Sequence, residues 1–392
     1  MNLKIPARLC GALLSLSLLV SVSAKTVEAT RPSRIRMETA SDGFHWSPPQ
    51  NVSDSFLTDS QAPALAATGG GVIHLVWEEA GGLLHSYRNG SSWSAPAPIS
   101  GTGDGEQPAL AAGAGDQLHL VYVNAPDIYY LAWDGSSWGL PRNISDTSSN
   151  SDSPDVAVAS DGSIHVVTTE QAGPDHALYY ARSGDGSSWP SYGFIPNAYG
   201  HAPSVDVTGT ATVTVRIAYR ETLVPDIYIV ERVGTAWSLP EAVTNTPGNF
   251  STTPKLILDD GTAHIAWRET ISDTHQVQYA HGPTWSPIVT LSQSSTGTTS
   301  PALALGAEGS IHAAWGDGAE SSFRLLHTWS SDGAAWQQPE PLAAGGLSFN
   351  GVTFVGTGDG RVHAAWVEGT TGEVWYASWP HYRIFLPLVL KG

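Results

Sequence analysis

Seven tryptophans recur at nearly even intervals along the chain, and each follows a short glycine-containing turn. The gaps between them are 47, 45, 51, 48, 48 and 51 residues. A period of this length is typical of an architecture built from similar supersecondary units. We therefore expect one closed domain of about seven units, although a length of 392 residues alone would indicate two or three domains. The tryptophans are Trp46, Trp93, Trp138, Trp189, Trp237, Trp285 and Trp336.

Each unit contains four short runs that are rich in apolar, aromatic and β-branched residues. In one unit these runs are residues 62–67, 71–77, 83–87 and 92–100, and glycine or polar turns separate them. This pattern predicts a four-stranded antiparallel meander. The second run is apolar on both faces in most units, which indicates a sheet that is covered by a neighbour on each side.

The number of runs predicts how the ring closes. The first two runs occur seven times, but the fourth run follows them only six times, and it is missing after residues 374–378. A spare fourth run lies at the N-terminus, at residues 46–53. We therefore predict an all-β fold, a seven-bladed β-propeller of four-stranded antiparallel blades whose last blade is closed by the N-terminal strand. An open array would need capping units, and the sequence shows none.

The two ends of the chain indicate a secreted protein. Residues 1–24 combine basic Lys4 and Arg8, an apolar run and a small-residue cleavage site, as in a signal peptide. Residues 25–34 are a lead-in segment, 35–379 the propeller, and 380–392 a tail that is a sorting or docking signal or an extra outer strand. Secretion or attachment to the cell surface is the expected localisation, with no transmembrane segment in the mature chain.

Charge and cysteine usage restrict the partners. The formal net charge is −18, and cleavage after residue 24 would remove two basic residues and no acid, giving −18 − 2 = −20. Such a surface repels phosphate backbones, which excludes nucleic acid. The only cysteine, Cys10, lies in the signal peptide, so the mature chain has no thiolate ligand. We expect a monomer without cofactor or metal, and a glycan or another cell-surface ligand as its partner.

The turns before the tryptophans resemble the Asp-box of the sialidase-like (BNR-repeat) propellers. The matching segments are 41–46, 183–189 and 331–336, and the resemblance covers about residues 35–379. It implies that these turns lie on the face opposite the active site, so that the seven tryptophans are structural. The arginine triad, the Arg-Ile-Pro motif and the catalytic pairs of the true sialidases are not matched, so the resemblance concerns the scaffold and not the chemistry.

A second recurring pattern lies on the opposite face. Two residues after the aromatic position of the second run, six of the seven units carry an acid and the other carries Asn124. Two interpretations stay open: each acid accepts hydrogen bonds from its own hairpin, or the acids form a rim that binds a cation or sugar hydroxyls. A glycosidase needs two carboxylates at a defined separation. The acids are Glu79, Glu170, Glu221, Glu269, Asp317 and Glu368.

Basic residues recur beside these acids and inside the strands. Arg220 and Arg268 precede Glu221 and Glu269 in adjacent units, where they could hold a ligand carboxylate or form salt bridges with nearby acids. Six second runs carry a histidine, which we expect to be buried and bonded to an adjacent blade; the fourth unit has Arg216 instead. The histidines are His74, His119, His165, His264, His312 and His363.

The sequence thus favours a secreted, non-catalytic propeller that binds a glycan or a cell-surface ligand, with the rim acids and the two arginines as its binding residues. One alternative is a carbohydrate-active enzyme, either a sialidase-type glycoside hydrolase or a propeller polysaccharide lyase. A second alternative is a structural envelope protein. The sequence identifies no catalytic residue.

Overall fold

The computed structural model describes residues 46–55, 58–172, 175–210, 212–285, 287–319, 322–346, 349–369 and 371–380. The chain divides into units 1–36 and 37–392, and every described residue lies in the second. The predictions for the signal peptide, the lead-in segment and tail residues 381–392 therefore lie outside the described residues. None of the helices in the described part is long and apolar enough to cross a membrane.

The described residues form 29 strands and a single short 3-10 turn, η1 (Ala307–Gly309), so the prediction of an all-β propeller is confirmed. The strands pair into six sheets, of which four have four strands, one has five and one has eight. The first two sheets along the chain contain β2 (Gln61–Ala67), β3 (Ile73–Glu79), β4 (Gly82–Asn89), β5 (Ser92–Trp93) and β6 (Ala97–Pro98), and then β7 (Glu106–Ala112), β8 (Leu118–Asn124), β9 (Asp127–Trp133) and β10 (Arg142–Asn143).

The eight-stranded sheet is continuous because the long strand β14 takes part in two meanders. It pairs with β13 through its first half and with β15 through its second half. The sheet consists of β11 (Ser151–Val158), β12 (Ile164–Ala172), β13 (Asp175–Ser183), β14 (Tyr192–Thr208), β15 (Thr214–Glu221), β16 (Ile227–Val233), β17 (Ala236–Trp237) and β18 (Glu241–Ala242).

The N-terminal strand completes the last sheet. Gln50 and Asn51 of β1 pair with Tyr376 and Trp375 of β29 in an antiparallel ladder. The last three sheets are β19 (Phe250–Asp259), β20 (Thr262–Ile271), β21 (Thr274–His281) and β22 (Val289–Thr290); β23 (Ala302–Leu305), β24 (Ile311–Ala319), β25 (Ser322–Ser330) and β26 (Glu340–Gly346); and β27 (Phe349–Gly356), β28 (Val362–Glu368), β29 (Glu373–Trp379) and β1 (Gln50–Asn51).

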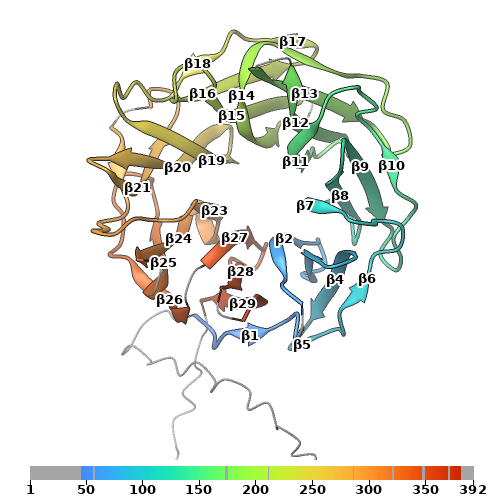
Figure 1. The fold of residues 1–392 in the computed structure, drawn as a ribbon, viewed down its shortest axis with the longest axis horizontal. Coiled ribbons are helices and arrows are strands. Elements are labelled where there is room, and N and C mark those ends of the chain that lie inside the picture. The colour runs from blue at the N-terminus through green and yellow to red at the C-terminus, as the bar shows by residue number, and fades with distance from the viewer. Residues whose placement is uncertain are drawn as a thin grey trace, which may run out of the picture. The chain divides into compact units, whose positions relative to one another are not determined.

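The sheets surround a central axis, with the first strand of each meander nearest to it (Figure 1). Going around the axis, these inner strands contact one another in the order β2, β7, β11, β14, β19, β23 and β27, and β27 contacts β2 again. The apolar core lies between neighbouring sheets. In one interface, Leu75 and Trp77 of the first sheet pack with Ala365, Val367 and Tyr376 of the last.

Each interface between neighbouring meanders but one carries the same three side chains, which we call an interface triad. A histidine of the second strand bonds a tyrosine or histidine of the third strand, and a tryptophan from the next meander packs edge-on against that partner. His264 Nδ1, for example, lies 2.6 Å from the Tyr279 hydroxyl, and the Trp336 ring centroid lies 4.7 Å from that of Tyr279. The triads are His74–His85–Trp138, His119–Tyr130–Trp189, His165–Tyr180–Trp237, His264–Tyr279–Trp336, His312–His327–Trp46 and His363–Tyr376–Trp93.

The expectation that the recurrent histidines are buried is confirmed, but the expected partner was wrong. All six are at most 8% exposed, and their Nδ1 bonds run to the third strand of their own sheet. The contact with the adjacent sheet is made by the tryptophan. The fourth unit departs as its sequence does: Arg216 pairs with Glu231 at 2.7 Å, and Trp285 donates to Glu241 instead of packing on a tyrosine.

Aspartates hold the turns before Trp138, Trp189 and Trp336. The Asp332 carboxylate accepts the backbone N–H groups of Ala334 and Ala335, each at 2.9 Å, and the Trp336 indole N–H donates to Gly333 O at 3.1 Å. Gly333 has a φ of +73°, and a Cβ there would lie 2.5 Å from the Tyr279 hydroxyl oxygen. Glycine is therefore required both by the turn and by the close approach to the neighbouring sheet.

Candidate functional site

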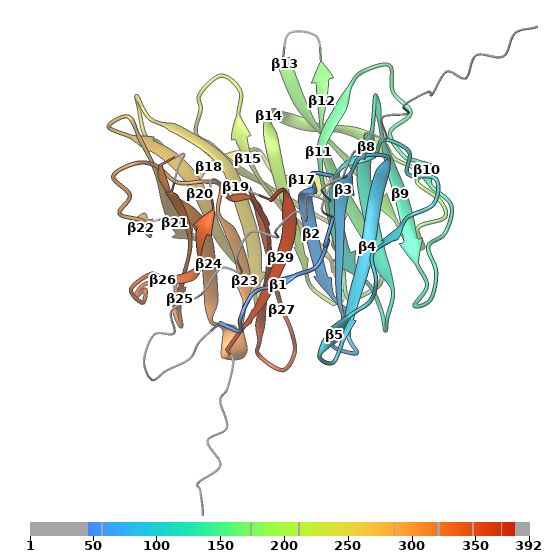
Figure 2. The ribbon, with the colours of Figure 1, turned by 60° about the horizontal axis from the view of Figure 1, so that its bottom comes forward.

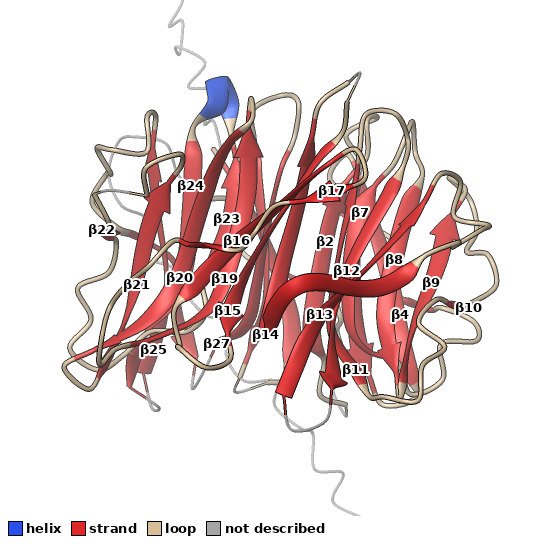
Figure 3. Cartoon of the chain, turned by 90° about the horizontal axis from the view of Figure 1, so that it is seen from above, coloured by secondary structure: helices blue, strands red, loops and turns tan. Residues whose placement is uncertain are grey.

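The two faces of the ring differ in which connections they carry. In Figure 2, the β4–β5 turn lies at one face and the β12–β13 hairpin projects from the other. Figure 3 likewise shows η1, which connects first and second strands, opposite the end of that hairpin. The second-to-third-strand turns and the predicted rim acids therefore lie on the face away from the tryptophan turns.

Three rim acids bind the loop that precedes their own sheet. Glu79 accepts from Thr58, Ser60 and the Trp77 indole at 2.9–3.0 Å. Glu269 accepts from Asn249 and the Trp267 indole, both at 2.9 Å. The buried Glu170 accepts the hydroxyl hydrogens of Thr147, Ser151 and Tyr192.

The other three acids bind their own turn or, for Asp317, the facing residue of the third strand. Glu221 accepts the backbone N–H groups of residues 223 and 224, Glu368 accepts from Thr371, and Asp317 pairs with Arg324 at 3.0 Å. All six predicted acids are thus engaged by the protein itself, which agrees with the structural interpretation of the pattern. Asn124 ends β8 at the corresponding position of the second sheet.

The arginines do not show the salt bridges that the sequence left open as one interpretation. Among the described residues, no ion pair joins Arg220 or Arg268 to a carboxylate, whereas Arg182, Arg216, Arg324 and Arg361 all have one. The Nε atom of Arg220 is buried and has no hydrogen-bond partner among the described residues. Arg268 Nε donates to the Thr252 hydroxyl at 3.3 Å, and burial lowers the pKa of its guanidinium.

The strand register places the two arginines at the same level of neighbouring meanders. Leu256 N donates to Ser204 Oγ and Leu258 N to Asp206 Oδ2, so β19 follows β14 with an offset of 52 residues. This offset sets Thr253 beside His201. His201 pairs with Arg220, and Thr252 pairs with Arg268. The ends of β15 and β20 therefore carry the two guanidinium groups around one edge of the ring.

Two histidines that the sequence pattern does not single out lie next to Arg220. The rings of His176 on β13 and His201 on β14 are 4.1 Å apart between centroids, and both side chains are half-buried. Burial lowers the pKa of His201; His176 and Arg220 lower it further, and Asp152 raises it. Neither histidine belongs to the repeating position, so the repeat gave no signal for them.

Exposed apolar side chains gather around the same residues. Tyr199 is 43% exposed, Phe250 55% and Leu223 81%. Backbone bonds hold them on adjoining loops: Thr222 N donates to Tyr199 O, and Ser251 N donates to Pro225 O. We call the surface formed by His176, Tyr199, His201, Arg220, Phe250 and Arg268 the arginine surface.

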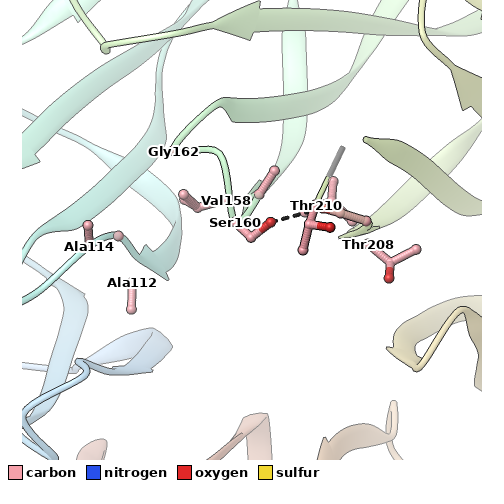
Figure 4. A pocket seen from close by; sticks show the side chains of 11 residues that line it. Ala112, Ala114, Val158, Ser160, Gly162, Thr208 and Thr210 are labelled. Atoms are coloured by element: carbon pink, nitrogen blue, oxygen red, sulfur yellow. Dashed lines mark hydrogen bonds between the residues drawn. The ribbon is translucent and has the colours of Figure 1, made fainter. Parts of the chain in front are cut away.

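Two depressions lie away from the arginine surface. One of about 500 Å³ is lined by small residues of three first-to-second-strand turns, among them Ala112, Ser160 and Thr208, and the Ser160 hydroxyl donates to Gly209 O (Figure 4). The other, of about 560 Å³, lies on the rim and is lined by Asp59, Glu78, Glu79, Asp104 and Glu106. Burial and the nearby Glu106 raise the pKa of Glu78, while the Gln107 N–H lowers it. No set of metal-binding side chains is found among the residues that the structure describes.

No protein-family model and no curated protein sequence matches the chain. Its fold is similar to that of an ulvan lyase, a polysaccharide lyase (TM-score 0.57, 11% identity, covering 83% of this chain and 95% of that one), and of a protein of unknown function from Dyadobacter fermentans (0.54, 12%, 85% and 98%). A leech intramolecular trans-sialidase is less similar (0.44, 10%, 86% and 69%). At these identities the likeness concerns the propeller fold.

Proposed function

We propose that this chain is a secreted β-propeller that binds an acidic glycan on the arginine surface. The observation that carries the proposal is the state of Arg220 and Arg268. Both side chains are partly removed from water and lack a carboxylate partner, in a chain whose net charge is −18. A buried charge without a counter-charge is costly, so an anionic ligand is the partner that this surface needs.

The polar atoms near the arginines support the same conclusion. In the part of the chain that the structure describes, the buried hydroxyl oxygens of Thr222, Ser251 and Thr253 find no hydrogen-bond partner, and neither does Arg220 Nε. Nearly all buried polar groups in proteins are hydrogen-bonded, so several unpartnered ones close together indicate a place where other molecules bind. The hydroxyl groups of a sugar offer both donors and acceptors to such a site.

The apolar members of the surface fit a sugar ring. Tyr199 and Phe250 are exposed aromatic side chains of the arginine surface, and aromatic rings pack against the apolar face of a ligand without a need for hydrogen bonds. Arginine recognises carboxylate and sulfate-like anions through paired N–H donors. Of the predicted acids, Glu221 and Glu269 lie next to the arginines in sequence, and we include them in the site as residues that hold its loops.

The solved structures of similar fold are consistent with this ligand class. The ulvan lyase has been solved with the oligosaccharide -[GlcA(1-4)Rha3S]- bound, which carries a carboxylate and a sulfate. We further propose that the eight-stranded sheet counts as two blades joined by β14, which makes the ring seven-bladed. The seven inner strands in closed order, and the tryptophan at every interface, support this count.

A glycan array that contains uronate, sulfated and neutral oligosaccharides tests the proposal. We expect binding to acidic glycans only, and a loss of at least about tenfold in affinity when Arg220→Gln and Arg268→Gln are combined, because each charge-assisted contact contributes about 1.5–3 kcal/mol. Arg142→Gln, an exposed arginine of β10, is the matched control and should change nothing. Equal binding of neutral glycans, or full affinity in the double variant, would contradict the proposal.

A second candidate function is polysaccharide lysis, which the histidine pair favours. β-Elimination from a uronate needs a base for the proton next to the carboxylate and a cation to neutralise that carboxylate. The neutral His201 imidazole offers the base, and the guanidinium of Arg220 beside it offers the cation. Incubation with polyuronates and measurement of the ultraviolet absorbance of the new double bond distinguishes a lyase from a binding protein, and fluorogenic glycosides assayed with Glu221→Gln and Glu269→Gln test the hydrolase alternative.

A further inference from the structure

His176 and His201 form a side-chain pair whose geometry differs from that of every other histidine pair in the described residues. They belong to neighbouring strands, their ring centroids are 4.1 Å apart, and their planes are tilted by 42°. No hydrogen bond is found for any of their four ring nitrogens among the described residues. The pair therefore has N–H donors that are not used to hold the fold.

Of the charged groups around the pair, only Arg220 favours a bound anion; the others are carboxylates. Arg220 is the register partner of His201 and presents its charge toward the pair. Of the carboxylates on the elements packed against the pair, Glu170 on β12 accepts three hydroxyl groups and Glu221 on β15 accepts two backbone N–H groups. Asp175 precedes His176 and is exposed, while Asp152 on β11 is the acid whose charge acts on His201.

We propose that His176, His201 and Arg220 form an anion subsite that becomes fully cationic only when the histidines are protonated, so that the protein binds sulfate or carboxylate groups of a glycan more tightly as pH falls. The subsite rests on the proposed function, because it recognises a substituent of the same acidic ligand. When both imidazoles are neutral it carries the charge of Arg220 alone. With both imidazoles protonated it carries three positive charges and four ring N–H donors, since each imidazolium has two.

Thermodynamic linkage gives the sign of the effect. An anion held between the rings stabilises the protonated form of an imidazole, so binding takes up protons from solution. Burial lowers the pKa of free His201 below its usual value, which leaves the ring neutral at pH 7 and available for this uptake. Affinity must therefore rise as pH falls toward the lowered pKa of free His201.

Calorimetric binding measurements on the full chain test the inference. The probes are a sulfated oligosaccharide without carboxylates, an oligouronate without sulfates, and the neutral parent sugar. Between about pH 8 and about pH 6 we expect the affinity for both anionic probes to rise about tenfold, with proton uptake detected as a dependence of the binding heat on the buffer. A preference for one anionic probe identifies which group occupies the subsite.

The double variant His176→Gln with His201→Gln should lose the rise in affinity between pH 8 and pH 6, whatever its affinity at pH 8. The matched control is His281→Gln, since His281 is also half-buried but lies at the end of β21 that is followed by a tryptophan turn. Affinity that does not depend on pH, or a pH dependence that survives in the double variant, would overturn the subsite. Absence of binding to both anionic probes at every pH would instead overturn the proposed function. If the double variant does not fold, proton uptake by the unchanged protein decides alone.

Discussion

Two kinds of histidine pair occur in this molecule, one inside the interfaces and one on the arginine surface. In the interface triads, the His74–His85 and His312–His327 pairs are buried, nearly parallel at 10°, and joined by a 3.0 Å contact between ring nitrogens. On the arginine surface, His176 and His201 are half-buried and tilted, and they have no such contact. The same side chain is a structural element where its nitrogens are bonded and a binding candidate where they are free.

The pKa values express the same contrast. Burial lowers the pKa of the triad histidines to about 4 in five sheets and to about 2 for His312, so they are neutral at any pH at which the fold is intact. The His176–His201 pair, which we call the rim pair, lies next to solvent and to Arg220. Protonation of a triad histidine thus acts on the stability of the fold, whereas protonation of the rim pair acts on ligand binding.

Acid should have the largest effect, because it acts on all triads at once. The unfolded chain binds protons on these histidines below about pH 6.5, and the folded chain binds them only near pH 4, so stability is complete above pH 6.5 and falls as pH decreases. In this window, each histidine lowers the free energy of unfolding by about 1.4 kcal/mol for each unit by which the pH decreases. Three carboxyl groups with raised pKa values, those of Asp206 (to about 6), Asp155 and Glu78, oppose the loss, but they are fewer than the six triad histidines of the second strands.

We therefore expect unfolding between about pH 6 and about pH 4, measured by tryptophan fluorescence and circular dichroism. Acidic glycans should raise the free energy of unfolding by no more than their own free energy of binding. A protein that is equally stable at pH 7 and pH 4 would show that the triad histidines are not buried as neutral groups, which would remove the basis of the comparison.

Single substitutions should separate the two kinds of histidine next. His264→Ala leaves the buried Tyr279 hydroxyl without its partner and opens a cavity at 5% exposure, which should cost about 2–4 kcal/mol in the free energy of unfolding. His201→Ala removes a half-buried ring without a partner and should cost less than about 1 kcal/mol. Urea denaturation measures both. Similar costs for the two variants would mean that the rim pair is structural as well.

The smallest expected effect concerns the rim acids. The indole N–H groups of Trp77 and Trp267 donate to the glutamate two residues later. The corresponding residue after Trp315 is Asp317, whose side chain is one methylene shorter, and the Trp315 indole N–H has no hydrogen-bond partner among the described residues. Asp317→Glu should therefore stabilise the fold by about 1 kcal/mol, and Glu269→Asp should destabilise it by a similar amount. Opposite shifts of the urea midpoints confirm that these acids are structural; two destabilising variants would contradict the shared geometry.

Much of the fold followed from local pattern. The spacing of the tryptophans, the alternation within the runs and the spare run at residues 46–53 predicted the meanders and the strand that pairs with β29. The partner of the recurrent histidines did not follow, because strand pairing within a sheet and packing between sheets place equally suitable groups near the same position. The same limit applied to Arg220 and Arg268, for which the sequence allowed both salt bridges and free guanidinium groups.

The sequence by itself determined the repeat, the strand order and the face on which each turn lies, since these depend on periodicities within a few residues of one another. Tertiary structure alone decided that His176 meets His201 beside Arg220, and that every predicted rim acid already has a partner in the protein. Such encounters depend on the bulge in the β14–β15 register and on the offset between β14 and β19. Neither leaves a mark in the local composition of the chain, because register is set by contacts between strands that lie far apart in sequence.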